Sequence, residues 1–197
     1  MKVIINRTDA IGDTVLTLPM AQAIKENYPG AEVIFLVSAK SADMFASHPF
    51  VDDIQVFDDR QSPYRKLRKL FRFFRKVKAD AYFHVGGSFY PTYVAWITKV
   101  PFRGGLVSRW LSFLYLNKGL RQKRSLASMH ESDYNLELLR PFGIEPKENQ
   151  RKLFGPALSV SPAEKKQAMT TFLEEHNIAS DKPMIFIHPG MTGHTLN

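Results

Sequence analysis

Residues 3–30 have the sequence VIINRTDAIGDTVLTLPMAQAIKENYPG. They open with a short apolar run, Val3–Asn6, which predicts a buried strand. A polar loop containing Gly12 follows, and residues 13–27 then carry apolar side chains at helical spacing. Pro19 marks either the true first turn of this helix or a kink, and the closing Tyr-Pro-Gly ends it. A strand, a glycine-containing loop and a helix in this order are typical of an α/β fold with a parallel sheet.

The same alternation continues along the chain. Strands are predicted at 32–37, 54–57, 81–85 and 102–106, and helices at 41–47, 64–78, 90–98 and 130–140. We therefore expect residues 1–155 to form an α/β domain, with a parallel sheet flanked by helices.

Residues 155–162 contain one Gly, two Pro and two Ser, which is typical of a linker. A helix at 162–176, a strand at 184–188 and a glycine-containing loop at 189–193 are predicted beyond it. We expect residues 156–197 to be a linker and the truncated start of a second α/β domain. Either further residues or a separate chain would complete that domain.

The composition narrows the function classes. The chain has 197 residues, 12% aromatic residues and no cysteine, so disulfides and thiolate metal sites are excluded. Its apolar runs are too short for a membrane span or a signal peptide. These observations favour a cytoplasmic location.

Positive charge is concentrated in one part of the chain. Residues 60–124 hold 16 of the 27 Lys and Arg residues but a single acid, Asp80. Such a region attracts phosphorylated glycolipid, an anionic membrane surface or nucleic acid. Helix 64–78 is basic and amphipathic, so we assign Arg68, Arg72 and Arg75 to membrane or anion contact. The alternative is an ordinary solvated helix face.

Asp13 is the candidate catalytic residue. It follows the first strand, where ligands bind in open α/β sheets, and Gly12 beside it lets a substrate approach closely. The dinucleotide-binding fingerprint is absent, because one glycine stands where three are needed. The alternative is that Asp13 only caps the helix.

These motifs carry a family resemblance. The segments concerned are Ile11–Pro19, Ala23–Lys25 and Tyr28–Ala31, with weaker matches at Pro49–Asp52, Ala79–Ala81, His130–Glu131, Leu138–Leu139, Phe142–Ile144 and Ile187–Gly190. Together they resemble the lipopolysaccharide heptosyltransferases, glycosyltransferase family 9.

The resemblance implies a GT-B fold of two Rossmann-like lobes. The N-terminal lobe would hold the acceptor and the C-terminal lobe the nucleotide sugar. The enzyme would move heptose from ADP-heptose to a lipopolysaccharide core acceptor with inversion, without a metal and with no cofactor besides the donor. Asp13 would be the general base. The protein would lie in the cytoplasm, peripheral on the inner membrane, and would bind no nucleic acid. The isolated 197-residue chain would be inactive.

Further contacts are assigned on the same basis. We expect acceptor contacts at Gly12, Thr14, Gly87 and His130, and donor contacts at Gly190, Thr192 and His194. The plainer alternatives are a turn at Gly87, a helix cap at His130 and an ordinary strand-to-helix turn for the loop at 189–193. Many members of the family carry Lys or Arg in the glycine-containing loop that begins at 189, where this chain offers only His194.

Two other functions are alternatives to a glycosyltransferase. One is a non-enzymatic basic module that binds a membrane or nucleic acid. Nucleic-acid platforms expose aromatic side chains for stacking, whereas Phe71 and Phe74 are predicted to fall in the buried stripe of helix 64–78. The other is an NAD enzyme, which the missing glycine fingerprint disfavours. His84, near a strand end, is interpreted as a hydrogen-bonded core residue.

Overall fold

A computed structural model describes residues 1–45, 48–107, 110–147, 161–178, 185 and 187. The chain divides into two compact units, Met1–Leu158 and Ser159–Asn197.

The larger unit is built on a parallel sheet, as predicted. Its described strands are β1 (Lys2–Arg7), β2 (Glu32–Ser38), β3 (Asp53–Phe57), β4 (Ala81–Gly86), β5 (Phe102–Leu106) and β6 (Lys118–Leu120). Their order is β3-β2-β1-β4-β5-β6, and each neighbouring pair is parallel. The order therefore reverses between β1 and β4. Sheets of this kind bind ligands outside the carboxyl ends of the strands at that switch point.

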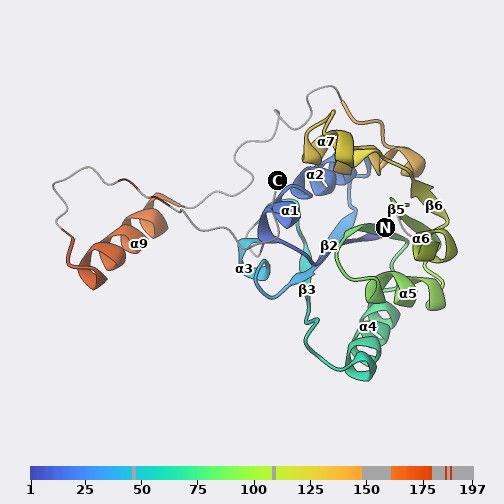
Figure 1. Cartoon of the computed structure of the whole chain (residues 1–197), viewed down its shortest axis with the longest axis horizontal. Coiled ribbons are helices and arrows are strands. Elements are labelled where there is room, and N and C mark those ends of the chain that lie inside the picture. Colours follow the sequence, from blue (N-terminus) through green and yellow to red (C-terminus); the bar gives the residue numbers. More distant parts are fainter. Residues whose placement is uncertain (46–47, 108–109, 148–160, 179–184, 186, 188–197) are drawn as a thin grey trace. The chain divides into compact units, whose positions relative to one another are not determined.

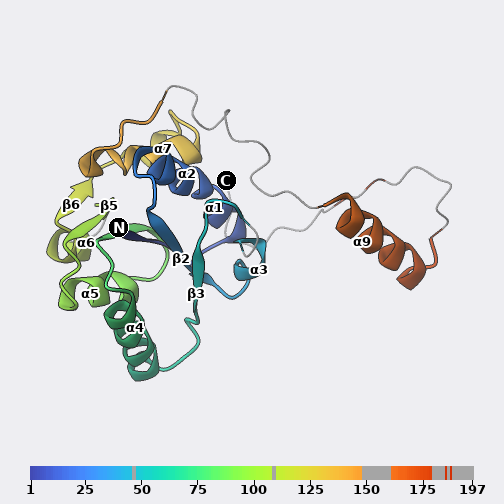
Figure 2. The same ribbon diagram turned by 180° about the vertical axis from the view of Figure 1, so that it is seen from behind.

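Helices cover both faces of the sheet. The described α-helices of this unit are α1 (Ile11–Val15), α2 (Leu18–Asn27), α3 (Ala42–Phe45), α4 (Pro63–Val77), α5 (Tyr90–Ile97), α6 (Trp110–Tyr115) and α7 (Glu131–Glu137), and its 3₁₀ helices are η1 (Arg124–Leu126) and η2 (Arg140–Phe142). Figures 1 and 2 show α4, α5 and α6 grouped on one side of the sheet, and α2 with α7 on the other.

The side chains of β1 alternate between the two faces of the sheet and so contribute to both helical layers. Successive side chains of a strand point to opposite faces. Val3 and Ile5 belong to the apolar cluster that includes α2 and α7, whereas Ile4 belongs to the cluster that includes Leu70 and Phe74 of α4. All five side chains are buried. The strand therefore reads as a continuous apolar run, as strands covered on both faces do.

The predicted helix 13–27 is wrong as a single element. The structure has two helices there, α1 and α2, separated at Leu16 and Thr17. Pro19 lies in the first turn of α2. Proline has no backbone N–H, and its ring would clash with the carbonyl of Val15 in a continuous helix. Of the two alternatives for Pro19, the first turn is confirmed.

The predicted helix 130–140 is too long. His130 is the N-cap of α7, which ends at Glu137, and Pro141 lies in the separate helix η2. Pro141 has no N–H to donate to the Glu137 carbonyl, and its ring crowds that carbonyl, so the α-helix does not continue through it. The short elements α6 and β6 were not predicted.

The described part of the smaller unit contains α9 (Pro162–Glu175). The Ser161 hydroxyl accepts a hydrogen bond from the Glu164 amide, and the Glu164 carboxylate accepts one from the Ser161 amide. This capping box fixes the start of the helix, and Pro162 occupies its first turn as predicted. The predicted linker and the strand and loop over 184–193 fall largely outside the described residues.

Candidate active site at the switch between β1 and β4

Arg7, the last residue of β1, organises the carboxyl edge of the sheet. Its side chain is only 8% exposed. Its Nε donates to Asp9 Oδ1 at 2.7 Å, and its Nη1 donates to the Val85 carbonyl at 3.2 Å. Its Nη2 lies 3.3 Å from Asp13 Oδ1. One guanidinium thus links the end of β1, the end of β4 and the start of α1, which a rigid planar group with five donors can do.

Glu131 and Arg124 extend this cluster. Glu131 Oε1 lies 3.7 Å from Arg7 Nη1 and also pairs with Arg124. Burial lowers the pKa of the Arg124 guanidinium; the Glu131 carboxylate opposes this shift, and the Arg7 cation adds to it. Chain segments more than a hundred residues apart therefore meet at the switch point. Arg7, Arg124 and Glu131 were not predicted as members of the site.

Asp13 lies at the carboxyl edge of the first strand, as predicted. Its side chain is 41% exposed while one oxygen faces Arg7. The N-cap of α1 is Ala10, and no side chain caps that helix end. Asp13 is therefore not the N-cap, although it remains an acid in the first turn of α1. A carboxylate that is held on one side and open to solvent on the other can accept a proton from a bound hydroxyl.

Gly12 and Thr14 flank Asp13 and differ in exposure. A methyl group added to Gly12 would meet no atom within 4 Å, so a ligand can approach the backbone there. Thr14 is fully buried, and its hydroxyl donates to the Ala10 carbonyl at 2.9 Å. In this structure Thr14 holds α1 in place and presents no side chain to the surface.

Gly87 has a structural role of its own. Its φ is +83°, and a Cβ there would lie 2.2 Å from Thr8 Oγ1. That hydroxyl accepts a hydrogen bond from the Ser88 amide at 2.9 Å. The turn after β4 therefore packs directly against the loop after β1, and only glycine fits.

His130 and His84 both make hydrogen bonds within the protein. His130 is exposed, and its Nδ1 accepts a hydrogen bond from the Ser132 amide at 3.2 Å, so the capping interpretation is correct. His84 is buried, with its Nδ1 3.1 Å from Asn6 Nδ2 and its ring against Phe89. The interpretation of His84 as a hydrogen-bonded core residue is confirmed.

The predicted donor contacts Gly190, Thr192 and His194 lie outside the described residues. Within the described ranges, no group of three or more His, Asp or Glu side chains is arranged to hold a metal ion. No helix in that part of the chain has the length and apolar character needed to cross a membrane.

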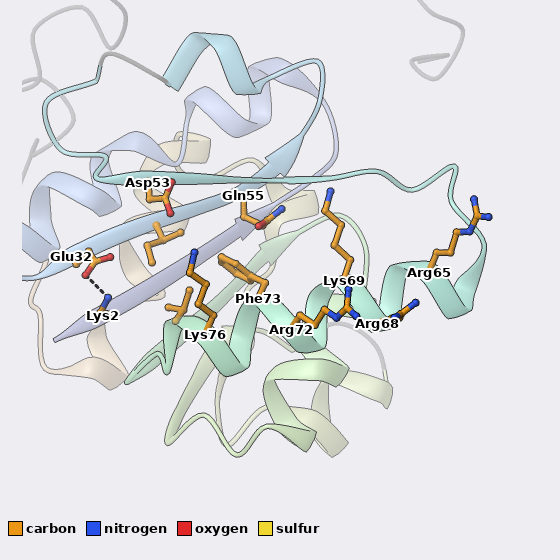
Figure 3. A pocket seen from close by; sticks show the side chains of 12 residues that line it. Lys2, Glu32, Asp53, Gln55, Arg65, Arg68, Lys69, Arg72, Phe73 and Lys76 are labelled. Carbon is orange, nitrogen blue, oxygen red and sulfur yellow. Dashed lines mark ion pairs between the residues drawn. The ribbon is translucent and has the colours of Figure 1, made fainter.

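A cationic groove lies along α4 (Figure 3). It is lined on one side by five cations and on the other by the starts of the first three strands, and its volume is about 750 Å³. The cations are Arg65, Arg68, Lys69, Arg72 and Lys76, and the facing polar residues are Lys2, Glu32, Asp53 and Gln55. Lys2 and Glu32 pair with each other at 2.8 Å. β1 spans about 17 Å, so the strand starts that line this α4 groove lie at the opposite edge of the sheet from Asp13.

The structure separates the three arginines assigned to anion contact. Arg68 and Arg72 line the α4 groove, whereas Arg75 lies over the ring of Phe71, 5.9 Å from its centroid. Phe71 is 42% exposed, so its predicted place in the buried stripe is wrong; Phe74 is buried as predicted. The buried stripe is centred on Leu70 and Phe74, and Phe71 points roughly 100° away from Leu70.

Comparisons with known proteins give a consistent fold. No protein-family model matches the chain. A Haemophilus influenzae protein described as a candidate glycosyltransferase is 24% identical over 204 residues, covering all of this chain and 56% of that protein. The family 9 glycosyl transferase from Veillonella parvula superposes with a TM-score of 0.71 at 18% identity, over 91% of this chain and 50% of that one.

Two Escherichia coli structures agree. The ADP-heptose lipopolysaccharide heptosyltransferase II has a TM-score of 0.69 at 18% identity, over 93% of this chain and 53% of that one. Heptosyltransferase WaaC, solved with ADP-2-deoxy-2-fluoro heptose, has a TM-score of 0.56 at 20% identity, over 76% of this chain and 51% of that one. The chain thus spans about half the length of these relatives and shares the fold of that half.

Proposed function

We propose that this chain is the acceptor-binding half of a glycosyltransferase. The supporting observation is the position of Asp13, a partly exposed carboxylate beside an open glycine at the switch point of a sheet shared with heptosyltransferases. The proposed reaction moves heptose from ADP-heptose to an anionic glycolipid of the lipopolysaccharide core. A second α/β domain would hold the donor, with Gly190, Thr192 and His194 among its contacts.

The chemistry is a single displacement. The acceptor hydroxyl attacks the anomeric carbon from the side opposite the nucleotide diphosphate. Asp13 takes the hydroxyl proton as the new C–O bond forms, and the bond to the diphosphate oxygen breaks, so the anomeric centre inverts. The reaction as proposed uses no metal. Arg7 holds one oxygen of Asp13 and so fixes the carboxylate for this proton transfer.

ADP-heptose is proposed on the strength of relatives. The two Escherichia coli proteins are named as heptosyltransferases, and one was solved with a fluorinated ADP-heptose. The open backbone at Gly12 leaves room for a bulky acceptor. A phosphorylated glycolipid also suits a chain whose residues 60–124 are strongly basic. Such an acceptor would require the protein to work in the cytoplasm, peripheral on the inner membrane.

A transfer assay tests this proposal. The polypeptide of the complete open reading frame is incubated with lipopolysaccharide that lacks core heptose, and products are read by mass spectrometry. We expect one heptose to be added from ADP-heptose, an inverted anomeric configuration by NMR, and an unchanged rate with a chelator. Failure to transfer from ADP-heptose or from any UDP-sugar, with folded protein, would refute the glycosyltransferase proposal. Transfer from UDP-sugars alone would mean that the donor is a UDP-sugar and not ADP-heptose.

The α4 cations give a second prediction. Replacing Arg68 and Arg72 together with Gln should weaken binding to vesicles rich in phosphatidylglycerol by about tenfold to thirtyfold, since each basic residue near such a surface contributes about 1 kcal/mol. Both side chains are free of ion pairs with described residues, so folding should be unaffected. Co-sedimentation measures the affinity. Lys165 and Lys166 of α9 changed to Gln form the charge-matched control, and equal losses in both variants would contradict a role for α4.

A further inference from the structure

Helix α6 presents an apolar face to solvent. Trp110, Phe113 and Leu114 are 74%, 62% and 53% exposed. They are spaced i, i+3 and i+4, so they lie on the same side of the helix. The opposite side is anchored by Ser112, which is buried. The exposed face is therefore a fixed feature of a packed helix.

The apolar surface continues onto the end of α5. The Tyr115 ring lies 5.4 Å from the Trp96 ring and 5.5 Å from the Tyr93 ring, measured between centroids. Trp96 and its neighbour Ile97 are exposed. We call Trp96, Ile97, Trp110, Phe113 and Leu114 the α5/α6 patch. Soluble monomers rarely expose so many large apolar side chains together unless the surface binds something.

Cations lie near this patch along the chain, and one of them contacts it. The Arg121 guanidinium lies 5.8 Å from the centroid of the Phe113 ring. Lys99, Lys118 and Lys123 are exposed and form no ion pair with any described residue. The sequence has no Asp or Glu between Asp80 and Glu131. The segment of chain that carries the patch thus bears charge of one sign only.

We infer that the α5/α6 patch inserts into the headgroup region of an anionic lipid bilayer. Interfacial surfaces combine Trp, Phe and Leu with Lys and Arg, which contact lipid phosphates while the apolar side chains enter the acyl boundary. Nucleic acid would use the aromatic rings and cations but not the aliphatic Ile97 and Leu114. A second copy of this chain would bring a second cationic segment against the first.

Docking to a bilayer would serve the proposed function, and this role rests on that function. A membrane-docked enzyme would meet a glycolipid acceptor in the same leaflet. The α4 groove lies on the same side of the sheet as α5 and α6 (Figures 1 and 3). The α4 cations would therefore strengthen attraction to the bilayer, whereas the α5/α6 patch would enter it.

The two tryptophans of the chain, Trp96 and Trp110, both belong to the patch and report insertion directly. The 197-residue chain is titrated with vesicles of phosphatidylglycerol and phosphatidylethanolamine, without donor or glycolipid. We expect a blue shift of tryptophan emission and quenching by brominated acyl chains. Trp110→Phe assigns the remaining signal to Trp96. Phosphatidylcholine vesicles should give a much weaker response.

Removing apolar side chains should weaken partitioning without unfolding the chain. Phe113→Ser with Leu114→Ser should lower the vesicle partition coefficient about tenfold to a hundredfold, with an unchanged circular dichroism spectrum. Leu114→Ser is matched by Leu126→Ser, which removes a leucine that is 67% exposed on η1. We expect Leu114→Ser, but not Leu126→Ser, to reduce vesicle binding.

Three results would overturn the inference. Vesicle binding without any quenching by brominated lipid would mean adsorption by charge alone. Unchanged partitioning of the double variant, combined with loss of a dimer in light scattering, would assign the patch to a second copy. Tight binding of a single-stranded oligonucleotide that the double variant loses, without vesicle insertion, would assign it to nucleic acid. The vesicle experiments contain neither acceptor nor donor. A negative result in them would therefore leave the transfer assay as a separate test of the proposed function.

Discussion

Replacing Asp13 with asparagine should lower the rate of sugar transfer by about 10²–10⁴-fold, the usual contribution of a general base. The amide has nearly the same size as the carboxylate but cannot accept the proton. The change does not disturb a helix cap, because the N-cap of α1 is Ala10. The rate is measured with the polypeptide of the complete open reading frame at saturating donor and acceptor.

Stability distinguishes this role from a structural one. The Asp13 side chain is 41% exposed and pairs with Arg7 at 3.3 Å, so its loss should cost less than about 1 kcal/mol. Asp9→Asn is the matched control, because Asp9 contacts the same guanidinium more closely, at 2.7 Å, but is not the proposed base. We expect Asp13→Asn to keep the melting temperature and lose the rate. A rate close to that of the wild type would exclude Asp13 as the base and turn attention to Glu131.

Strands β1 to β5 were predicted from the sequence to within one residue at each end. β1, β2 and β4 are near-continuous runs of buried residues, and burial on both faces makes such runs conspicuous. The helix boundaries were less predictable. Pro19 divides what apolar spacing presents as one helix, because periodicity reports the buried face and not the continuity of hydrogen bonds. The predicted helix 130–140 ends three residues early, at Glu137.

Tertiary packing set the details that the sequence did not reveal. Lys66 belongs to the basic helix 64–78, yet it is buried, with its Nζ 2.9 Å from Asp59 Oδ1 and over the Tyr90 ring. Phe71 is interpreted as buried but is exposed. Both differences follow from the rotation of α4 about its axis against the sheet, which depends on α5 as its neighbour.

The candidate site was predictable only where it is local. Gly12 and Asp13 follow the first strand in sequence, so the crevice rule places them at the carboxyl edge. Arg7, Arg124 and Glu131 come together from β1, η1 and α7. No spacing in the sequence indicates their meeting, although Arg7 at the end of an apolar strand is a signal: a charged residue there needs a partner at the edge of the sheet.

Two glycines of the predicted site should respond oppositely to alanine. Gly87→Ala should destabilise the larger unit by about 2–5 kcal/mol, which combines the cost of a left-handed backbone with that of overpacking. Its φ is +83°, and the new Cβ would lie 2.2 Å from Thr8 Oγ1 and 2.8 Å from the Thr8 amide nitrogen. Moving Thr8 would also break its hydrogen bond with Ser88.

Gly12→Ala is the matched change, because its methyl group would point into open space within α1. Alanine favours a helix over glycine by about 0.5–1 kcal/mol, so the melting temperature should stay or rise slightly. For a unit of this size the loss at Gly87 corresponds to a fall of about 4–20 °C, which calorimetry resolves easily. If acceptor approaches the backbone at Gly12, the same variant should raise KM for the acceptor while kcat and stability hold. A Gly87→Ala protein that melts with the wild type would show that the turn after β4 relaxes away from Thr8, and Gly87 would then be free to contact acceptor.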